Sequence, residues 1–216
     1  MKSTFEPTAT KLREIGAVQL TQIAPSSLKT GVYPDERYDP ALLLPVASLV
    51  LTTRGVVGVT ADGNLLMDIH NADHPQARRW HDNGISVGFT SHYAALRVTF
   101  GPQSVDGCGG ENIVIACDER WTLDDLDAGL LIRRSSTGEL IRLARPLVAT
   151  PCAPFARFAT GNAVLAGAAM KAALMALHHG QRGFYIGLDA PLPVAVVQAG
   201  DRVYVPVARS AIATSA

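Results

Sequence analysis

The sequence predicts a mainly β protein built around a barrel or strongly curved sheet, with one long helix and a few short ones. Many apolar runs are short and β-rich, Gly, Pro and Asp interrupt them, and few segments read as helices. Several runs also alternate, as where Ile141 and Leu143 point to one face and Arg142 to the other. The strands are expected over residues 17–23, 47–53, 95–100, 112–117, 130–134, 140–150, 184–188, 194–198 and 202–207.

The long helix is expected over residues 161–177, where alanine, leucine and methionine dominate. Its high helix propensity and its apolar character around most of the circumference predict a largely buried packing element. Thr160 or Asn162 is expected to cap its start, and His178, His179 and Gly180 to end it. Short helices are expected over 75–82 and 122–127, and an irregular, proline-rich loop over 26–45.

Length and composition favour one domain over residues 16–207, with an N-terminal extension over 1–15 and a flexible tail over 208–216. The 19 basic residues balance the 19 acidic ones, so nucleic acid and membrane are not expected partners. The start of the chain lacks the apolar region of a secretory signal, and the three cysteines are odd in number. We therefore expect a cytoplasmic protein with free thiols.

Cys152 is the first candidate for chemistry, because Pro151 and Pro154 place its thiol on a stiff, non-helical segment. Arg145 and Arg157 lie near it in sequence and would lower its pKa if they also lay near it in space. A thiolate is a nucleophile and a soft metal ligand. The alternative is a small, buried apolar residue.

Two further segments each allow two interpretations. Asp68, His70, Asp73 and His74 form a metal-like cluster, or a solvated turn that leads into a helix. The glycine-rich run over 107–110 brings backbone N–H groups near a phosphate, or makes a tight turn. Glu111 and Asn112, which follow this run, could orient a ligand or satisfy local backbone groups. Trp80, Trp121 and Cys117 are expected to be packing residues.

Five short motifs, taken together, resemble the MOSC domain family, named after the C-terminal domain of molybdenum cofactor sulfurases. They are GGENIVI at 109–115, TPCAPFARF at 150–158, DIHNADHPQA at 68–77, GFY at 183–185 and GD at 200–201. The resemblance implies a MOSC-like β-barrel in which Cys152 carries sulfur or ligates the molybdenum of a molybdopterin cofactor. We expect the cofactor to contact His70, Gly110, Glu111, Asn112, Arg145 and Arg157. The chain departs from the family pattern at Val59, Asn71, Ala72 and Thr150, so its pocket chemistry is expected to differ.

The resemblance leaves open whether the protein is an enzyme. As an enzyme it would be similar to reductases of N-hydroxylated compounds, with electrons from a separate redox protein, because the chain has no Rossmann, iron–sulfur or flavin motif. As an alternative it would be a non-catalytic module that carries sulfur or hands a cofactor to a partner protein. A third reading is a metal-dependent hydrolase that uses Asp68, His70 and His74. Pyridoxal phosphate accompanies this family through a separate domain of the sulfurases, and none of the four lysines here has a Schiff-base context: Lys2, Lys11, Lys29 and Lys171.

Overall fold

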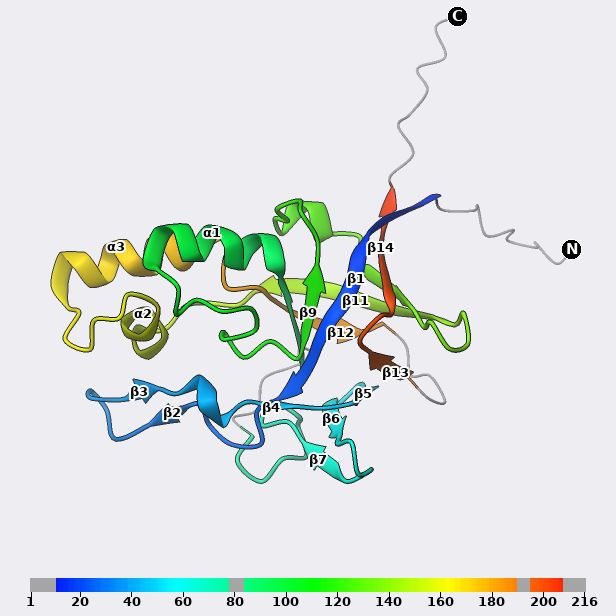
Figure 1. Cartoon of the computed structure of the whole chain (residues 1–216), viewed down its shortest axis with the longest axis horizontal. Helices are drawn as coiled ribbons and strands as arrows, with labels where there is room; N and C mark the ends of the chain where they lie inside the picture. The colour runs from blue at the N-terminus through cyan, green and yellow to red at the C-terminus, as the bar shows by residue number, and fades with distance from the viewer. Residues whose placement is uncertain (1–10, 78–83, 190–194, 208–216) are drawn as a thin grey trace, which may run out of the picture.

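The protein is a seven-stranded β-barrel with helices gathered at one end, as the computed structural model of residues 11–77, 84–189 and 195–207 shows (Figure 1). The strands follow the order β14, β10, β11, β12, β8, β9, β1, and β14 pairs with β1 to close the ring. All neighbours are antiparallel except β8 and β9. The bounds are β1 Lys11–Ile23, β8 Ile85–Phe89, β9 Ile113–Ala116, β10 Leu130–Arg133, β11 Leu140–Val148, β12 Phe184–Leu188 and β14 Arg202–Val207. The predicted mainly β barrel is confirmed.

A second, four-stranded sheet shares the core of the barrel. Its order is β13, β5, β6, β7, with bounds Ala195–Gln198, Ser48–Thr52, Gly55–Val59 and Leu65–Met67. Leu49 and Val56 of this sheet belong to the same buried apolar cluster as Ile113 and Ile186 of the barrel. Each such side chain contributes about 1.5–3 kcal/mol when fully buried.

The segment over 26–45 is more regular than the predicted loop. It forms a short antiparallel pair, β2 (Lys29–Thr30) with β3 (Arg37–Tyr38), and a 3-10 turn at Pro40–Leu42. Strand β4 (Leu44–Pro45) then pairs with the end of β1. The runs are too short for a periodic pattern to reveal them in the sequence.

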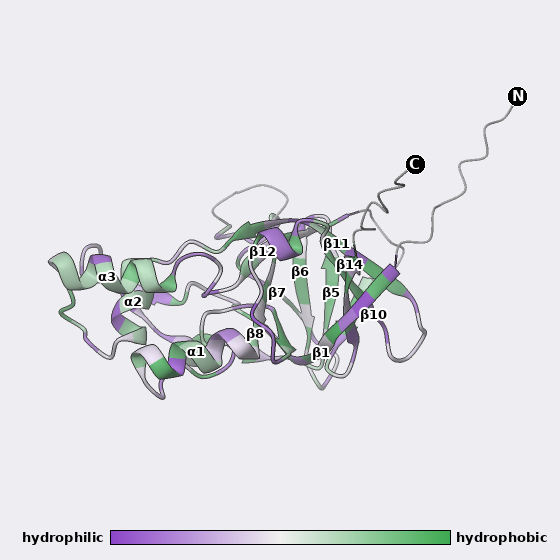
Figure 2. Ribbon diagram, turned by 90° about the horizontal axis from the view of Figure 1, so that it is seen from above, coloured by the Kyte–Doolittle hydropathy of each residue, from purple (hydrophilic) through white to green (hydrophobic). Residues whose placement is uncertain are grey.

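Three helices lie at one end of the barrel (Figure 2): α1 Thr90–Phe100, α2 Ala153–Ala159 and α3 Gly167–Leu177. They surround a second apolar cluster that includes Tyr93, Phe155 and Leu177. The strand predicted over 95–100 is wrong, because these residues form the end of α1. Leu96 and Phe100 mimic strand alternation, but the buried residues of α1 are His92, Tyr93 and Leu96, which is a helical spacing.

The long helix exists, but its predicted start and burial are wrong. It begins at Gly167 rather than near residue 161, and Ala166, not Thr160 or Asn162, precedes it as N-cap. Within α3 only Ala173 and Leu177 are buried. Alanine raises helix propensity without requiring burial. The composition therefore predicted that a helix forms here, but it did not predict how much of the helix is exposed.

The remaining predicted helices are shorter than expected or not covered by the structure. Residues 122–127 contain only the 3-10 turn Asp124–Leu126. The expected helix over 75–82 lies partly outside the described residues, and residues 75 and 76 form a turn. The tail over 208–216 and Trp80 lie outside them, whereas β1 already begins within the expected extension, at Lys11. Among the described helices, none is long and apolar enough to cross a bilayer.

Candidate functional site

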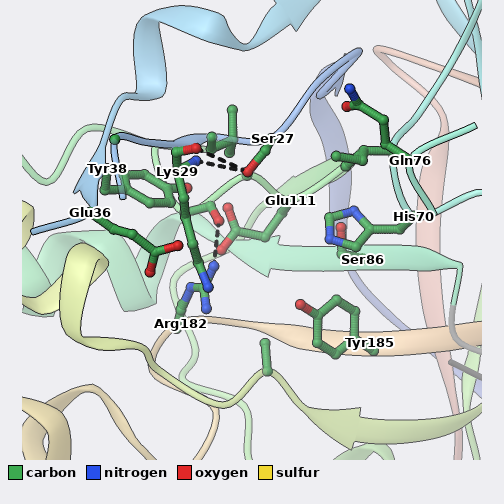
Figure 3. Close-up of a pocket in the computed structure, with 16 residues that line it drawn as sticks. Ser27, Lys29, Glu36, Tyr38, His70, Gln76, Ser86, Glu111, Arg182 and Tyr185 are labelled. Atoms are coloured by element: carbon green, nitrogen blue, oxygen red, sulfur yellow. Dashed lines mark hydrogen bonds between the residues drawn. The ribbon is translucent and has the colours of Figure 1, made fainter. Parts of the chain in front are cut away.

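A cavity of about 520 Å³ lies where the helical end meets the barrel, and this volume is typical of a small-molecule site. Its walls come from the β2–β3 segment, the loops after β7 and before β9, and strands β8, β11 and β12 with their ends (Figure 3). The lining residues are Ser27, Leu28, Lys29, Gly31, Glu36, Tyr38, Ile69, His70, Gln76, Ser86, Gly109, Gly110, Glu111, Ala149, Arg182 and Tyr185.

Glu111 is the buried carboxyl group of the cavity wall. The hydroxyl of Tyr93, on α1, donates to its Oε2 atom and accepts a hydrogen bond from the backbone N–H of Gly109 at 2.9 Å. The Oε1 atom is buried and has no hydrogen-bond partner among the described residues. Burial raises the pKa of Glu111, although the hydrogen bond from Tyr93 and the charge of Arg182 oppose the shift.

The glycine loop before β9 approaches its neighbours too closely for any side chain. Gly110 has a φ of +90°, and a Cβ atom there would lie 2.8 Å from Cδ1 of Leu28. A Cβ atom at Gly109 would lie 2.5 Å from Oε1 of Glu111. The Gly110 N–H donates to the carbonyl of Gly107 at 3.0 Å. The loop is therefore a tight turn, and Gly109 and Gly110 also form part of the cavity wall.

Arg182, just before β12, is the lining cation whose charge acts on the Glu111 carboxyl group. It donates from Nη1 to the carbonyl of Thr150 at 3.0 Å and from Nη2 to the carbonyl of Gly109 at 3.2 Å. Its guanidinium carbon lies 4.9 Å from the centre of the Phe155 ring, and its Nε is buried without a partner. Burial lowers the pKa of Arg182, but nearby ionisable groups, led by Tyr38 and Tyr185, together raise it above its usual value.

Asp68, His70 and Asn112 form a hydrogen-bond network on the opposite side of the cavity. Asp68 is fully buried, and its Oδ1 lies 2.9 Å from Nδ1 of the half-exposed His70. Its Oδ2 accepts from Nδ2 of Asn112 at 2.9 Å, and Oδ1 of Asn112 accepts from the backbone and hydroxyl of Ser86. Asn112 is thus satisfied within the protein and does not line the cavity, whereas His70 does.

Cys152 lies beside the cavity and is not one of its lining residues. It is half-buried, packs against the second apolar cluster and has extended backbone angles (φ −121°, ψ 158°) as the N-cap of α2. The predicted non-helical conformation holds for Cys152 itself, but the helix begins at the next residue. The residues on either side of Cys152 contact the lining residue Arg182. The carbonyl of Thr150 accepts from its Nη1 at 3.0 Å, and the Phe155 ring lies 4.9 Å from its guanidinium carbon.

Arg145 and Arg157, predicted to contact the cofactor and activate the thiol, do not line the cavity. Arg145 lies at the irregular part of β11, donates to the carbonyl of Leu188 at 3.1 Å and pairs with Asp189 at 3.7 Å. Arg157 lies on α2 and donates to the carbonyl of Pro34 at 3.2 Å. The sequence-near arginines therefore have other partners, and Arg182 takes the position by the cavity.

The predicted metal cluster is not assembled. Among residues 11–77, 84–189 and 195–207, no group of three or more His, Cys, Asp or Glu side chains is arranged to hold a metal ion. His74 has its Nε2 atom 3.2 Å from the carbonyl of Pro25, and its Nδ1 accepts from the N–H of Gln76 at 3.1 Å. Asp73 pairs with Arg54 at 2.6 Å.

Cys108, Cys117 and Trp121 do not belong to the cavity lining. Cys108 is buried, and burial raises its pKa. Cys117 is half-buried near Ser91, and burial raises its pKa as well. Trp121 is buried in the main core, as expected, with Arg13 over its ring.

The sequence prediction missed Tyr38 and Arg182. Over residues 11–77, 84–189 and 195–207, neither the buried hydroxyl of Tyr38 nor the buried Nε of Arg182 has a hydrogen-bond partner. The only sequence signal for Arg182 is its place directly before the GFY motif, whose Tyr185 also lines the cavity. Tyr38 lay in the segment predicted as an irregular loop, so nothing in the sequence pointed to it.

The fold is similar to that of the YUAD protein from Bacillus subtilis. That crystal structure aligns with a TM-score of 0.56 and 14% identity, over 93% of this chain and 100% of the other. A hypothetical protein aligns with a TM-score of 0.49 and 14% identity, over 91% of this chain and 70% of the other. No family model and no curated protein matches the sequence. At this level of identity, the first likeness establishes a shared fold alone.

Proposed function

We propose that the chain is a MOSC-type domain that binds a phosphate-bearing cofactor of the molybdopterin class in this cavity, next to Cys152. One observation carries the proposal: within the part of the chain that the structure describes, three buried polar atoms of lining residues have no hydrogen-bond partner, namely the Tyr38 hydroxyl, Oε1 of Glu111 and Nε of Arg182. Each unpaired buried group costs about 1–3 kcal/mol, which a polar ligand would recover.

The residues present fit such a group. Arg182 and Lys29 would hold the phosphate, since charged donors bind phosphate oxygens strongly. Glu111 and Tyr38 offer acceptors and donors for a planar, hydrogen-bonding ring, and Cys152 offers a soft sulfur ligand beside them. When bound, the cofactor would supply two-electron redox chemistry, with electrons from a separate redox protein. The protein would bind and orient it and keep water from its ring.

Metal and pterin analysis of protein made in a cofactor-competent host tests the proposal. Molybdenum and a fluorescent pterin oxidation product should copurify with the wild-type chain. Cys152→Ala should lose the metal, and Arg182→Leu should lose both. Cys117→Ala is the matched control, because Cys117 is also a half-buried thiol but contacts Ser91 rather than the cavity residues. Wild-type protein free of both metal and pterin would contradict the proposal.

A second candidate is a sulfur carrier that holds a persulfide on Cys152. It is favoured by the position of this half-buried thiol beside the lining rather than within it. Mass spectrometry after exposure to a labelled low-molecular-weight persulfide should find sulfur on Cys152, with Cys108 and Cys117 as thiols in the same sample. Equal labelling of Cys152 and Cys117 would count against a dedicated carrier.

A further inference from the structure

The side chain of Asp68 accepts hydrogen bonds from three fixed donors. Its Oδ1 accepts from the backbone N–H of His70 at 2.8 Å, and its Oδ2 accepts from the backbone N–H of Ala24 at 2.8 Å. Nδ2 of Asn112 donates to Oδ2 at 2.9 Å. As a carboxylate, this group is an acceptor only, and donors surround both of its oxygens.

This carboxylate fixes the tautomer of His70. Nδ1 lies 2.9 Å from Oδ1 of Asp68, so Nδ1 must carry a proton. In the neutral ring the lone pair is then on Nε2. Among the described residues, Nε2 has no hydrogen-bond partner. The ring projects into the cavity on the side that faces Glu111 (Figure 3).

We propose that His70 is a proton acceptor of this cavity and that Asp68 is the residue that positions it. The bound molecule would present an O–H, N–H or S–H group to Nε2. Its proton would move to Nε2 while the bonding pair stays on the molecule. The imidazolium so formed would be stabilised by the Asp68 carboxylate, and the new anion by Arg182, which lines the same cavity. The inference does not depend on a metal or cofactor.

Nitrogen NMR of ¹⁵N-histidine-labelled wild-type protein tests the tautomer directly. For His70 in the neutral form, we expect the proton on Nδ1 and the lone pair on Nε2. A neutral ring protonated on Nε2 would overturn the proposal. Because this measurement needs no substitution, it holds whatever the stability of the variants.

Asp68→Asn supplies the positioning test. If the new amide nitrogen replaced Oδ2, it would face two donors, from Ala24 and Asn112. If it replaced Oδ1, it would face only one fixed donor, the backbone N–H of His70. The imidazole could change tautomer, and Nδ1 would then accept a hydrogen bond from the amide. We therefore expect the imidazole proton of His70 to move to Nε2 in the variant. If Asp68 only supported the fold, the tautomer would not change.

Diethyl pyrocarbonate, which acylates an imidazole nitrogen lone pair and releases ethyl carbonate, reads out the reactivity of Nε2. His70 should react in the wild-type protein and about tenfold more slowly in Asp68→Asn. His74 is the internal control, because both of its ring nitrogens already face backbone groups. Equal rates for His70 in the two proteins would overturn the positioning role.

A matched pair of probes tests the ligand chemistry. Phenol, which carries a hydroxyl, should slow acylation of His70, and anisole, in which a methyl group replaces that proton, should not. Equal protection by both, or by neither, would overturn the expected proton donor. All these measurements use metal-free protein, so their failure is separate from a failure to bind molybdenum or pterin.

Discussion

The buried carboxyl group of Glu111 makes stability depend on pH. Burial raises the pKa of Glu111 above its ordinary value of 4.5, so the folded state holds the proton more tightly than the unfolded state. The stabilisation is fully present below that ordinary value and is lost as pH rises through the pKa of the folded protein.

We therefore expect Glu111→Gln to stabilise the protein at about pH 8 relative to wild type, with little difference at about pH 4. Glutamine keeps the shape and an acceptor for the Tyr93 hydroxyl without the cost of a buried charge. Urea unfolding at both pH values measures this. Glu36→Gln, on another wall of the cavity, is the control, and a pH-independent difference for Glu111→Gln would contradict the prediction.

Gly110→Ala should cost about 1–3 kcal/mol more than Gly138→Ala. Both glycines have positive φ, +90° and +74°, so both substitutions strain the backbone. Only at Gly110 would the new methyl group meet Leu28, whereas nothing lies within 4 Å at Gly138. Paired denaturant titrations measure the difference. Equal losses of unfolding free energy in the two variants would contradict the prediction, because the loop would then accommodate the methyl group without strain.

The sequence predicted the parts of the cavity wall that short motifs mark. Gly110, Glu111 and His70 do line the cavity, because local turns place them there. Arg182 could not be found in this way, since its partners Gly109 and Thr150 are distant in sequence. Nearness along the chain instead favoured Arg145 and Arg157, whose contacts lie elsewhere.

At the scale of elements, α3 is an apolar helix with most of its surface exposed. Met175 is 58% exposed, whereas Leu177 is completely buried. We expect Met175→Gln to change the free energy of unfolding by no more than about 0.5 kcal/mol. Leu177→Ala should cost about 2–5 kcal/mol. Thermal or urea unfolding distinguishes the two, and a large loss for Met175→Gln would mean that this face is covered.

The strands were easier to predict than the helices. β12 and β14 have the expected bounds, because buried alternation or a bounded apolar run marks each of them. The GD motif also has a structural reason: Asp201 accepts from the backbone and hydroxyl of Ser135 and from the N–H of Gln198. Strands β6 and β8 were missed, since their valine and glycine content gave no clear period.

At the scale of the whole molecule, closure of the barrel determines which hydrogen bonds last longest. β1 pairs with β14 on one side and with β9 on the other. In the part of the chain described, β7 pairs with β6 alone, at the edge of the smaller sheet. Native-state hydrogen exchange should therefore be slowest in β1 and faster in β7, and the reverse order would contradict the closed ring.

The β1–β14 seam also has a consequence for synthesis. The second edge of β1 is paired only when β14, Arg202–Val207, is present. A nascent chain that still lacks this strand carries the open edges of β1 and β10, which can pair with other chains. The barrel therefore closes only after nearly all of these residues have left the ribosome, and a chaperone that shields strand edges would act during that interval.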